Sequence, residues 1–431
     1  MRWVYVTAVR LGRTGGQSTR ILEFCRALAK TAEVILLAPP ADFPLPEGVR
    51  YIPVPLPARP PREVRFQINV YRALRQLSGP PPDVVYVYAG AFNTGALAVA
   101  RQTGSRSLLE FNGLPYLEFG PEHPGARGVW LRAITYRLMA LVDTRLADLV
   151  VTVTRQLARA IRQHTRARTP MLVSSNGVNP TQFQPRPTAQ ARAALGLPAE
   201  GPYVGFVGVF AAWQGLDILL QGVAQMAPAY PQLRLLLVGA GSQRPRLERL
   251  VADLGLGQQV RFTGAVPYET IPTTINACDL MVAPFPLSTR NRLAGVSPLK
   301  VFEYLGCGKP VLGAAVPGME FIQQEGLGAL FTPGDPGDLA AQLDRLLSLP
   351  AAEREPWAAA LARSRWKNTP GRSSSGRSSR PSGPFTPFRP GPSQDHRRWR
   401  TEDRRCKDVA QRRATPPPWP PSPGLERGGW G

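Results

Sequence analysis

The stretch GVSPLKVFEYLGCGKPVLG, from Gly295 to Gly313, combines a loop, a short helix and the beginning of an apolar strand. Ser297 suits the N-cap of the helix, and Pro298 suits its first position, where a missing N–H costs nothing. The residues 310–312, Pro-Val-Leu, then begin a strand. The stretch is therefore predicted to be one loop, helix and strand unit of an α/β domain.

The predicted helix has an apolar side and a charged side. Its apolar stripe and the glycines that can end it are Val301, Tyr304, Leu305, Gly306 and Gly308. The free N–H groups of the first turn carry a partial positive charge, which Lys300 reinforces, so we predict a diphosphate site there. Glu303 lies near mid-helix, where its carboxylate can accept hydrogen bonds from ribose hydroxyls. The alternative is a surface glutamate beside a lysine whose aliphatic chain packs on the protein.

The rest of the chain alternates apolar, β-branched runs with stretches of helical length. Four such runs, VVYVYA, SLLEFNG, ADLVVTVT and MLVSSNGV, begin at residues 84, 107, 147 and 171. A second series follows a polar, proline-containing segment: YVGFVGVF, LRLLLVGAG, VRFTGAV, LMVAPF and KPVLGAA. This pattern is typical of βαβ units with buried parallel strands. We predict two doubly wound, Rossmann-like α/β domains, residues 1–184 and 185–365, whose strand ends face a shared cleft.

Glycine-bearing turns follow several of the predicted strands. In the first domain Gly15 and Gly16 precede an amphipathic helix with Ile21, Phe24, Cys25 and Leu28 on one face. Such glycines let the backbone approach an anion at a helix N-terminus, although a turn that binds nothing is the equal alternative. The spacing is not Gly-x-Gly-x-x-Gly, so a nicotinamide dinucleotide site is not indicated. The second domain repeats the pattern at Gly208 and at Gly239 to Gly241.

Five segments, in this order and spacing, resemble retaining glycosyltransferases of family 4, which have the GT-B architecture. They are SSNGVNPTQFQP, YVGFVGVFAAWQGLDILLQGV, LRLLLVGAGSQRPRLERL, VRFTGAVPYETIPTTINACDLMVAPF and GVSPLKVFEYLGCGKPVLG. The resemblance covers residues 1 to 350 and is most specific in the second domain. It implies transfer of a hexose-type sugar from a nucleoside-diphosphate sugar with retention of configuration, without a bound metal or other cofactor. The acceptor is expected to be a glycan or a lipid-linked molecule, as in cell-envelope polysaccharide biosynthesis.

The resemblance also assigns donor-binding residues. Glu303 matches the second glutamate of the family's Glu-x7-Glu motif, and the first falls at Gly295. The chain resembles a branch with Ser-Pro-Leu-Lys before that glutamate, so the segment from Ser297 to Leu299 is expected to bind the diphosphate. Its backbone N–H groups come from Ser297 and Leu299, and Pro298 lies between them. The family's phosphate-binding Arg and Lys fall at Val209 and Gln214, with Lys300, Arg290 or Arg292 as candidate substitutes. The remaining expected donor contacts are Gly15, Gly16, Gly208, Trp213, Gly239, Gly241, Arg261 and Phe262.

In the first domain LLEFNG matches the strand end where many family members place a histidine beside the donor sugar. Here that position is Asn112, and Glu110 alternates with it. Lys300 is expected to stabilise the leaving group, Asn112 to lie beside the sugar and Glu110 to act as acceptor base. A Glu110 carboxylate satisfied by backbone N–H groups is the structural alternative.

Composition limits the other classes of site. The four cysteines, Cys25, Cys278, Cys307 and Cys406, show no Cys-x-x-Cys spacing, and the three histidines have no zinc-like spacing, so buried thiols and no metal site are expected. The N-terminus does not read as a signal peptide, and no uncharged run reaches transmembrane length, which predicts a cytoplasmic protein. Residues 123–162 hold many arginines among Leu, Trp and Tyr. They predict either ordinary domain helices or a peripheral contact with an anionic membrane on its inner face.

Residues 366–431 differ sharply from the rest. This tail has almost no aliphatic residues and carries 14 Lys/Arg against 5 Asp/Glu, so +9 of the formal charge of +22 lies there and +13 remains in the body. Such a composition predicts disorder, and out-of-frame translation of a GC-rich gene is one hypothesis for it. The alternative function is a non-catalytic sugar-nucleotide-binding relative whose basic tail binds nucleic acid. The tail lacks regular aromatic interleaving, so nucleic acid is the less favoured partner.

Overall fold

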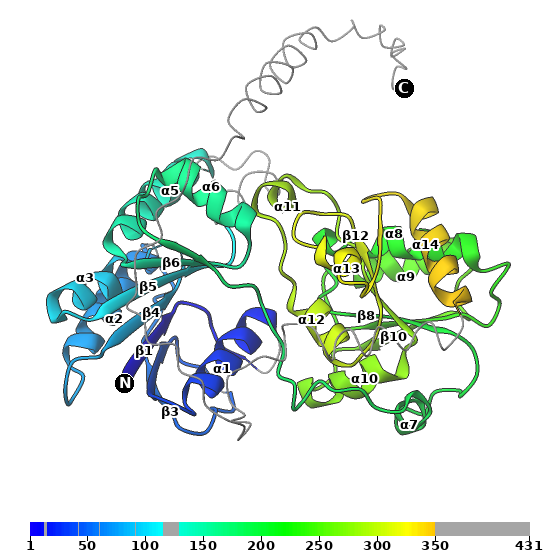
Figure 1. The fold of residues 1–431 in the computed structure, drawn as a ribbon, viewed down its shortest axis with the longest axis horizontal. Helices are drawn as coiled ribbons and strands as arrows, with labels where there is room; N and C mark the ends of the chain where they lie inside the picture. The colour runs from blue at the N-terminus through cyan, green and yellow to red at the C-terminus, as the bar shows by residue number, and fades with distance from the viewer. Residues whose placement is uncertain (13–14, 42, 60, 91, 115–128, 350–431) are drawn as a thin grey trace, which may run out of the picture. The chain divides into compact units, whose positions relative to one another are not determined.

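The computed structural model describes residues 1–12, 15–41, 43–59, 61–90, 92–114 and 129–349 of the 431-residue chain. The predicted tail at 366–431 and the frameshift hypothesis therefore lie outside the described residues, as do Cys406, His123 and His396. Within the described part, two all-parallel sheets are each built from strands that alternate with helices (Figure 1).

The first sheet has seven strands in the order β3-β2-β1-β4-β5-β6-β7. Its strands are β1 (Arg2–Thr7), β2 (Glu33–Ala38), β3 (Val49–Pro53), β4 (Val84–Tyr88), β5 (Arg106–Phe111), β6 (Leu149–Thr152) and β7 (Met171–Val173). The connecting helices are α1 (Gly16–Leu28), α2 (Arg62–Arg75), α3 (Thr94–Thr103), α5 (Val129–Leu146) and α6 (Arg155–Thr165).

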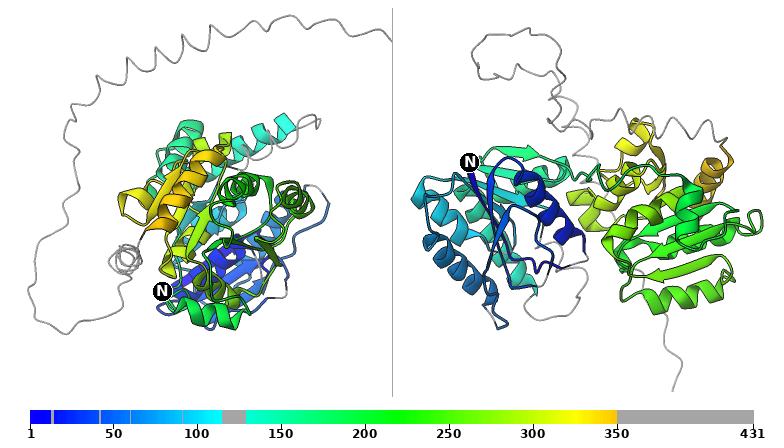
Figure 2. Two further views of the ribbon diagram at one scale, coloured as in Figure 1. Left: turned by 90° about the vertical axis from the view of Figure 1, so that its right-hand side faces the viewer. Right: turned by 90° about the horizontal axis from the view of Figure 1, so that it is seen from below.

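Helices cover both faces of the first sheet (Figure 2). Alternate residues of β1 point to opposite faces, because side chains alternate along a strand. Tyr5 joins a core cluster with Ile21 and Cys25 of α1, whereas Val4 and Val6 join a separate cluster with side chains of α2, α3 and α6. The first sheet is thus doubly wound, as predicted.

The second sheet has six strands in the order β10-β9-β8-β11-β12-β13. Its strands are β8 (Tyr203–Val207), β9 (Arg234–Val238), β10 (Val260–Gly264), β11 (Leu280–Ala283), β12 (Val311–Ala314) and β13 (Gly328–Phe331). The other elements are α7 (Thr188–Ala194), η1 (Ala212–Gln214), α8 (Leu216–Met226), α9 (Arg244–Asp253), η2 (Tyr268–Thr270), α10 (Ile271–Ala277), α11 (Thr289–Ala294), α12 (Leu299–Gly306), α13 (Phe321–Gln324) and α14 (Pro336–Ser348). One continuous hydrophobic core holds this sheet and its helices together.

Between the sheets the chain runs from β7 to α7. Val173 is the last residue of the first sheet, and Phe183 already packs in the core of the second sheet. In both sheets the strand order reverses beside the first strand of the series, at β1/β4 and at β8/β11. Ligands of doubly wound folds bind outside the carboxyl ends of the strands at such switch points.

The prediction for the opening stretch needs one correction. The apolar stripe is buried and the helix ends at Gly306, but α12 begins at Leu299 with Pro298 as its N-cap and has no side-chain cap. Ser297 is therefore not the N-cap, since its Oγ accepts a hydrogen bond from the backbone N–H of Asn176 at 3.0 Å instead. Ser297, two residues before the helix, thus bonds to the backbone of Asn176 instead of capping α12.

Candidate functional site

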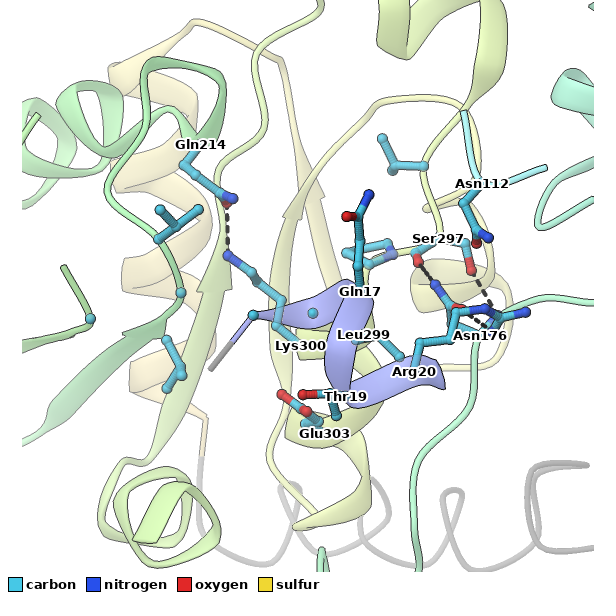
Figure 3. Close-up of a pocket in the computed structure, with 18 of the residues that line it drawn as sticks. Gln17, Thr19, Arg20, Asn112, Asn176, Gln214, Ser297, Leu299, Lys300 and Glu303 are labelled. Carbon is cyan, nitrogen blue, oxygen red and sulfur yellow. Dashed lines mark hydrogen bonds between the residues drawn. The ribbon is translucent and has the colours of Figure 1, made fainter. Parts of the chain in front are cut away.

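A cavity of about 560 Å³ lies at the carboxyl ends of strands from both sheets. The first sheet and its helix α1 contribute Gly15, Gly16, Gln17, Thr19, Arg20, Tyr88 and Asn112, and Asn176 of the connecting segment joins them. The second sheet contributes residues that follow β8, β9, β10 and β11, together with the first turns of α12. Figure 3 shows that Lys300 and Glu303 of α12 and Gln17 and Arg20 of α1 lie around the same space.

Lys300 is the central cation of this cavity. Its Nζ donates a hydrogen bond of 2.7 Å to Oε1 of Gln214 and lies 3.9 Å from the centroid of the Phe206 ring. A side chain at Gly208 would collide with this ammonium group, so the glycine makes room for it. Burial lowers the pKa of Lys300 to about 7, and the nearby charge of Glu303 opposes that shift.

Glu303 lies one helical turn further along α12 and also lines the cavity. Its side chain is buried, and its Oε1 accepts a hydrogen bond of 3.1 Å from the hydroxyl of Tyr268. Burial raises the pKa of Glu303 to about 7, which the Tyr268 hydrogen bond and the Lys300 charge oppose. The first two turns of α12 thus present to the cavity an ammonium and a carboxyl group whose charged forms burial disfavours.

The backbone at the start of α12 completes this corner of the cavity. Ser297, Pro298 and Leu299 all line it, and Leu299 packs within 3.5 Å of the position that a side chain at Gly16 would take. The N–H groups of Leu299 and Lys300 precede the first bond of the helix, which Val301 donates to the carbonyl of Pro298 at 3.1 Å. Together with Lys300 they form a positively polarised surface suited to an anion.

Two residues of the second domain border the cavity on the side of η1 and α11. The guanidinium of Arg290 lies 5.8 Å from the centroid of the Trp213 ring, and both residues line the cavity. Trp213 remains 38% exposed, so its ring offers a partly solvated stacking surface. Of the candidate substitutes for the missing phosphate-binding pair, the structure thus brings Lys300 and Arg290 to the cavity.

The structure brings most predicted donor-binding residues together at this cavity. Those that line it are Gly15, Gly16, Gly208, Trp213, Gly239, Ser297, Pro298, Leu299, Lys300 and Glu303. Gly241 does not line it, because a side chain there would strike the backbone of Phe210 and the glycine serves internal packing.

The predicted base-contacting pair on β10, Arg261 and Phe262, does not line this cavity. Arg261 is exposed and Phe262 packs edge-on against Phe210 at 6.0 Å, and neither lines the cavity. The lining comes instead from Ala265, Val266 and Tyr268, in the segment that follows the strand. The strand runs alongside β9, so only the residues beyond its carboxyl end can reach the ligand space.

Glu110 is also not where an acceptor base must be. Its side chain is 0% exposed and does not line the cavity. The carboxylate accepts hydrogen bonds, each of 2.6 Å, from Arg20 Nε, Tyr86 Oη and Asn112 Nδ2. Burial keeps this carboxylate away from an acceptor hydroxyl, and its three hydrogen bonds organise the neighbouring side chains. Asn112 does line the cavity.

Sequence reasoning missed seven polar side chains that line the cavity: Gln17, Thr19, Arg20, Tyr88, Asn176, Tyr268 and Asn291. Of these, Arg20 carried a readable signal. A cation in the second turn of a helix faces the positive end of the helix dipole, so it needs an acidic partner elsewhere in the fold. That partner is Glu110.

Among the described residues no group of three or more His, Cys, Asp or Glu side chains is placed to hold a metal ion. Cys25, Cys278 and Cys307 are free and buried, as predicted, and burial raises the pKa of each thiol to about 12. Across the described helices, none combines the length and the hydropathy needed to cross a bilayer.

Two family models match consecutive parts of the chain: "Glycosyltransferase Family 4" over residues 14–182 and "Glycosyl transferases group 1" over residues 201–349. A D-inositol 3-phosphate glycosyltransferase from Frankia alni is 30% identical over 297 residues, which cover 64% of this chain and 69% of that protein. The chain belongs to glycosyltransferase family 4.

Other relatives of this family 4 chain match a shorter part. A D-inositol 3-phosphate glycosyltransferase from Thermobispora bispora is 34% identical over 213 residues, 44% of this chain and 48% of that protein. This chain thus spans about half the length of the first curated relatives that it matches.

Among solved structures, sucrose-phosphate synthase from Thermosynechococcus elongatus superposes with a TM-score of 0.67 at 22% identity, covering 84% of this chain and 94% of that one. The family 4 chain therefore has the GT-B fold of two Rossmann-like domains, as predicted.

Proposed function

We propose that this family 4 chain transfers a sugar from a nucleoside-diphosphate sugar to a glycan or lipid-linked acceptor, with retention of configuration. The observation that carries the proposal is the pairing of Lys300 and Glu303 on one face of α12, both lining the cavity. They are three residues apart, which is about 4.5 Å along a helix axis. This spacing matches a diphosphate at the helix N-terminus followed by a ribose one turn deeper.

The leaving group is the part of the reaction that these residues serve. The bond between the anomeric carbon and the donor diphosphate breaks, and the acceptor oxygen bonds to the same face of the sugar. The acceptor proton passes to the departing diphosphate. Charge that develops on the phosphates is stabilised by the first turn of α12 and by Lys300, which are in place before the reaction. Because the diphosphate takes the acceptor proton, a transfer of this kind needs no protein base, which agrees with the position of Glu110 outside the cavity lining.

Retention of configuration and independence from a bound metal or other cofactor are parts of the proposal that rest on family membership. One reaction tests both the retention of configuration and the independence from a metal. With a donor that turns over, NMR of the transferred sugar should show the anomeric configuration of the donor, and chelation should leave the rate unchanged. An inverted product would refute the front-face route.

The donor class is tested first by binding. We expect full-length protein to bind one nucleotide family among UDP-, GDP-, ADP- and TDP-sugars with micromolar affinity in calorimetry. Glu303→Ala should weaken that binding about tenfold to a hundredfold, because hydrogen bonds to a charged acceptor contribute about 1.5–3 kcal/mol. Glu269→Ala, on η2 outside the cavity lining, is the matched control. If the folded protein bound none of these four classes of nucleotide sugar, the proposal of a nucleotide-sugar donor would be wrong.

A lipid-linked acceptor would require contact with a membrane surface. The solvent side of α6 carries three exposed arginines, Arg155, Arg159 and Arg162, and the exposed Arg166 follows directly after the helix. Helix α5 lies beside α6 (Figure 1) and exposes Ile134, Leu138 and Val142. Basic and apolar side chains on neighbouring helices suit the headgroup region of anionic lipids. We expect sedimentation with phosphatidylglycerol vesicles but not with phosphatidylcholine vesicles. Equal sedimentation with both kinds of vesicle would contradict a contact between this enzyme and anionic lipids.

A further inference from the structure

A chain of polar contacts runs from α1 to the segment that precedes α12. It begins at Arg20, whose side chain is only 12% exposed. The guanidinium donates on two sides: Nε to Glu110 Oε1 at 2.6 Å and Nη1 to Asn176 Oδ1. One planar cation therefore joins the first sheet to the connecting segment after β7 (Figure 3).

At Glu110 the series of polar contacts is anchored by further hydrogen bonds. Glu110 belongs to β5, and its carboxylate is also bound by Tyr86 of β4 and by Asn112 at 2.6 Å each. Both strands are central in the first sheet. Arg20 is thus paired with a buried carboxylate that two further donors hold in place, and this ion pair offsets the charge that Arg20 would otherwise present to the cavity.

The other end reaches the residue that fixes the start of α12. Asn176 is buried, its backbone N–H donates to Ser297 Oγ at 3.0 Å and its Nδ2 donates to the Ser297 carbonyl. Only Pro298, with its restricted φ angle, separates Ser297 from the first helical residue. The position of the Ser297 carbonyl therefore sets the direction in which the first turn of α12 points.

A second contact holds the same segment from the other side. The hydroxyl of Thr154, before α6, donates to the carbonyl of Ala294, and Ala294 packs within a core cluster of the first domain. The residues between Ala294 and Ser297 are thus held at both ends by residues of the first domain and its connecting segment. Val296, between them, donates to the carbonyl of Pro317 in the second domain at 2.8 Å. The turn that is to hold the donor phosphates is therefore shaped by both domains.

We propose that Arg20 is a positioning residue that sets diphosphate affinity by fixing Ser297 through Asn176. This inference rests on the proposed function, because it assigns the first turn of α12 to the donor diphosphate. It makes the first domain a determinant of donor binding, and it separates the role of Arg20 from a direct contact with the ligand. The two roles differ in one measurable respect: an indirect effect of Arg20 disappears once Asn176 can no longer transmit it.

A double-mutant cycle on nucleotide affinity tests the proposal. Arg20→Lys keeps a positive charge beside Glu110 but cannot bridge to Asn176, since an ammonium lacks the guanidinium fork. Asn176→Ala removes the contact with the Ser297 carbonyl. We expect each variant to weaken binding of the nucleoside diphosphate that the wild type selects by about tenfold, and the double variant to be no weaker than either one. Binding of the parent nucleoside should stay unchanged in all three, because the base and ribose lie deeper along α12.

Two control variants match these changes. Asn179→Ala alters the same connecting segment and also removes a bond to α1, the 3.0 Å contact with Glu23, but it does not touch Ser297. Arg26→Lys alters an exposed arginine of α1. Both should keep wild-type affinity. Effects of Arg20→Lys and Asn176→Ala that multiply to about a hundredfold would instead show that Arg20 contacts the ligand, and the proposal would be wrong. Equal losses for nucleoside and nucleoside diphosphate would also overturn it.

Hydrogen exchange of the free protein separates this inference from the donor assignment. Amides in the first turn of α12 should exchange faster in both Arg20→Lys and Asn176→Ala than in the wild type and the two controls. Faster exchange in a protein that binds no nucleotide would keep the positioning role and refute the proposed function. Unchanged exchange in both variants would refute the positioning role whatever the protein binds.

Discussion

Replacing Lys300 with glutamine is expected to lower sugar transfer about a hundredfold to a thousandfold, the usual effect of removing one donor that stabilises developing charge. The affinity for the nucleotide sugar should fall with it, because the ammonium is the central cation of the cavity. Thermal stability should stay equal or rise slightly. Burial already lowers the pKa of Lys300 to about 7, so the charged form costs folding free energy. Kinetics and calorimetry of the variant, with its melting temperature, measure all three.

The contact between Lys300 and Gln214 offers a sharp control. Their side-chain atoms are 2.7 Å apart, so the double variant Lys300→Gln, Gln214→Lys returns an ammonium to nearly the same place from the opposite side. It should recover at least tenfold of the activity lost in the single variant. A double variant as inactive as the single one would mean that Lys300 acts through packing on Phe206 and not through its charge.

The same pair predicts a pH profile for nucleotide-sugar binding. The pKa of Lys300 is lowered to about 7, so its charge is lost as the pH rises above that value and the affinity falls. The pKa of Glu303 is raised to about 7, so its carboxylate becomes protonated below that value and loses capacity to accept ribose hydrogen bonds. A maximum near pH 7 follows. The alkaline decline should be absent in Lys300→Gln, and a flat wild-type profile would contradict both assignments.

Gly239→Ala is expected to lower the free energy of unfolding by about 3 kcal/mol. Gly239 has a φ angle of +138°, which side chains rarely adopt, and an added methyl group would collide with the carbonyl of Gly208. The backbone contacts Gly208 N–H to Val238 and Gly239 N–H to Gly264, each 2.9 Å, hold the ends of β8, β9 and β10 together there. We expect a melting temperature lower by about 5–10 °C.

Gly257→Ala is the matched control for that substitution. An added methyl group at Gly257 meets no atom within 4 Å, so its effect should stay within about 0.5 kcal/mol. Calorimetric melting of the two variants beside the wild type measures the difference. If Gly239→Ala had the melting temperature of the wild type, the glycine would not be needed for the packing of the strand ends, and only a role in ligand binding would remain.

The sequence was sufficient to predict the two doubly wound sheets and to place Lys300 and Glu303 together on one helix. Long apolar runs such as those at β4, β8 and β9 are buried on both faces, so their pattern is unambiguous. Lys300 and Glu303 were found because helical spacing relates them directly. The strands β2, β3 and β13 were not predicted, although β2 has six residues and is buried from Val34 to Ala38.

The rest of the site depends on tertiary contacts that local sequence does not encode. Glu110 and Asn112 alternate along one strand, yet Glu110 turns into a buried network with Arg20, a residue 90 positions earlier. The sequence around Ser297 is typical of a helix N-cap. In the structure Ser297 is instead bound by Asn176, which lies 121 positions earlier in the chain. The residues that reach the cavity lie beyond the carboxyl end of β10, and local sequence does not show where that strand ends.

The most direct test of the donor site is a crystal structure of the protein with the nucleoside diphosphate that it binds most tightly. We predict that the phosphates lie at the first turn of α12 within hydrogen-bonding distance of Lys300 Nζ, and that the ribose hydroxyls contact Glu303. A nucleotide bound outside this cavity, or with its base at Lys300 and its phosphates away from α12, would contradict the assignment.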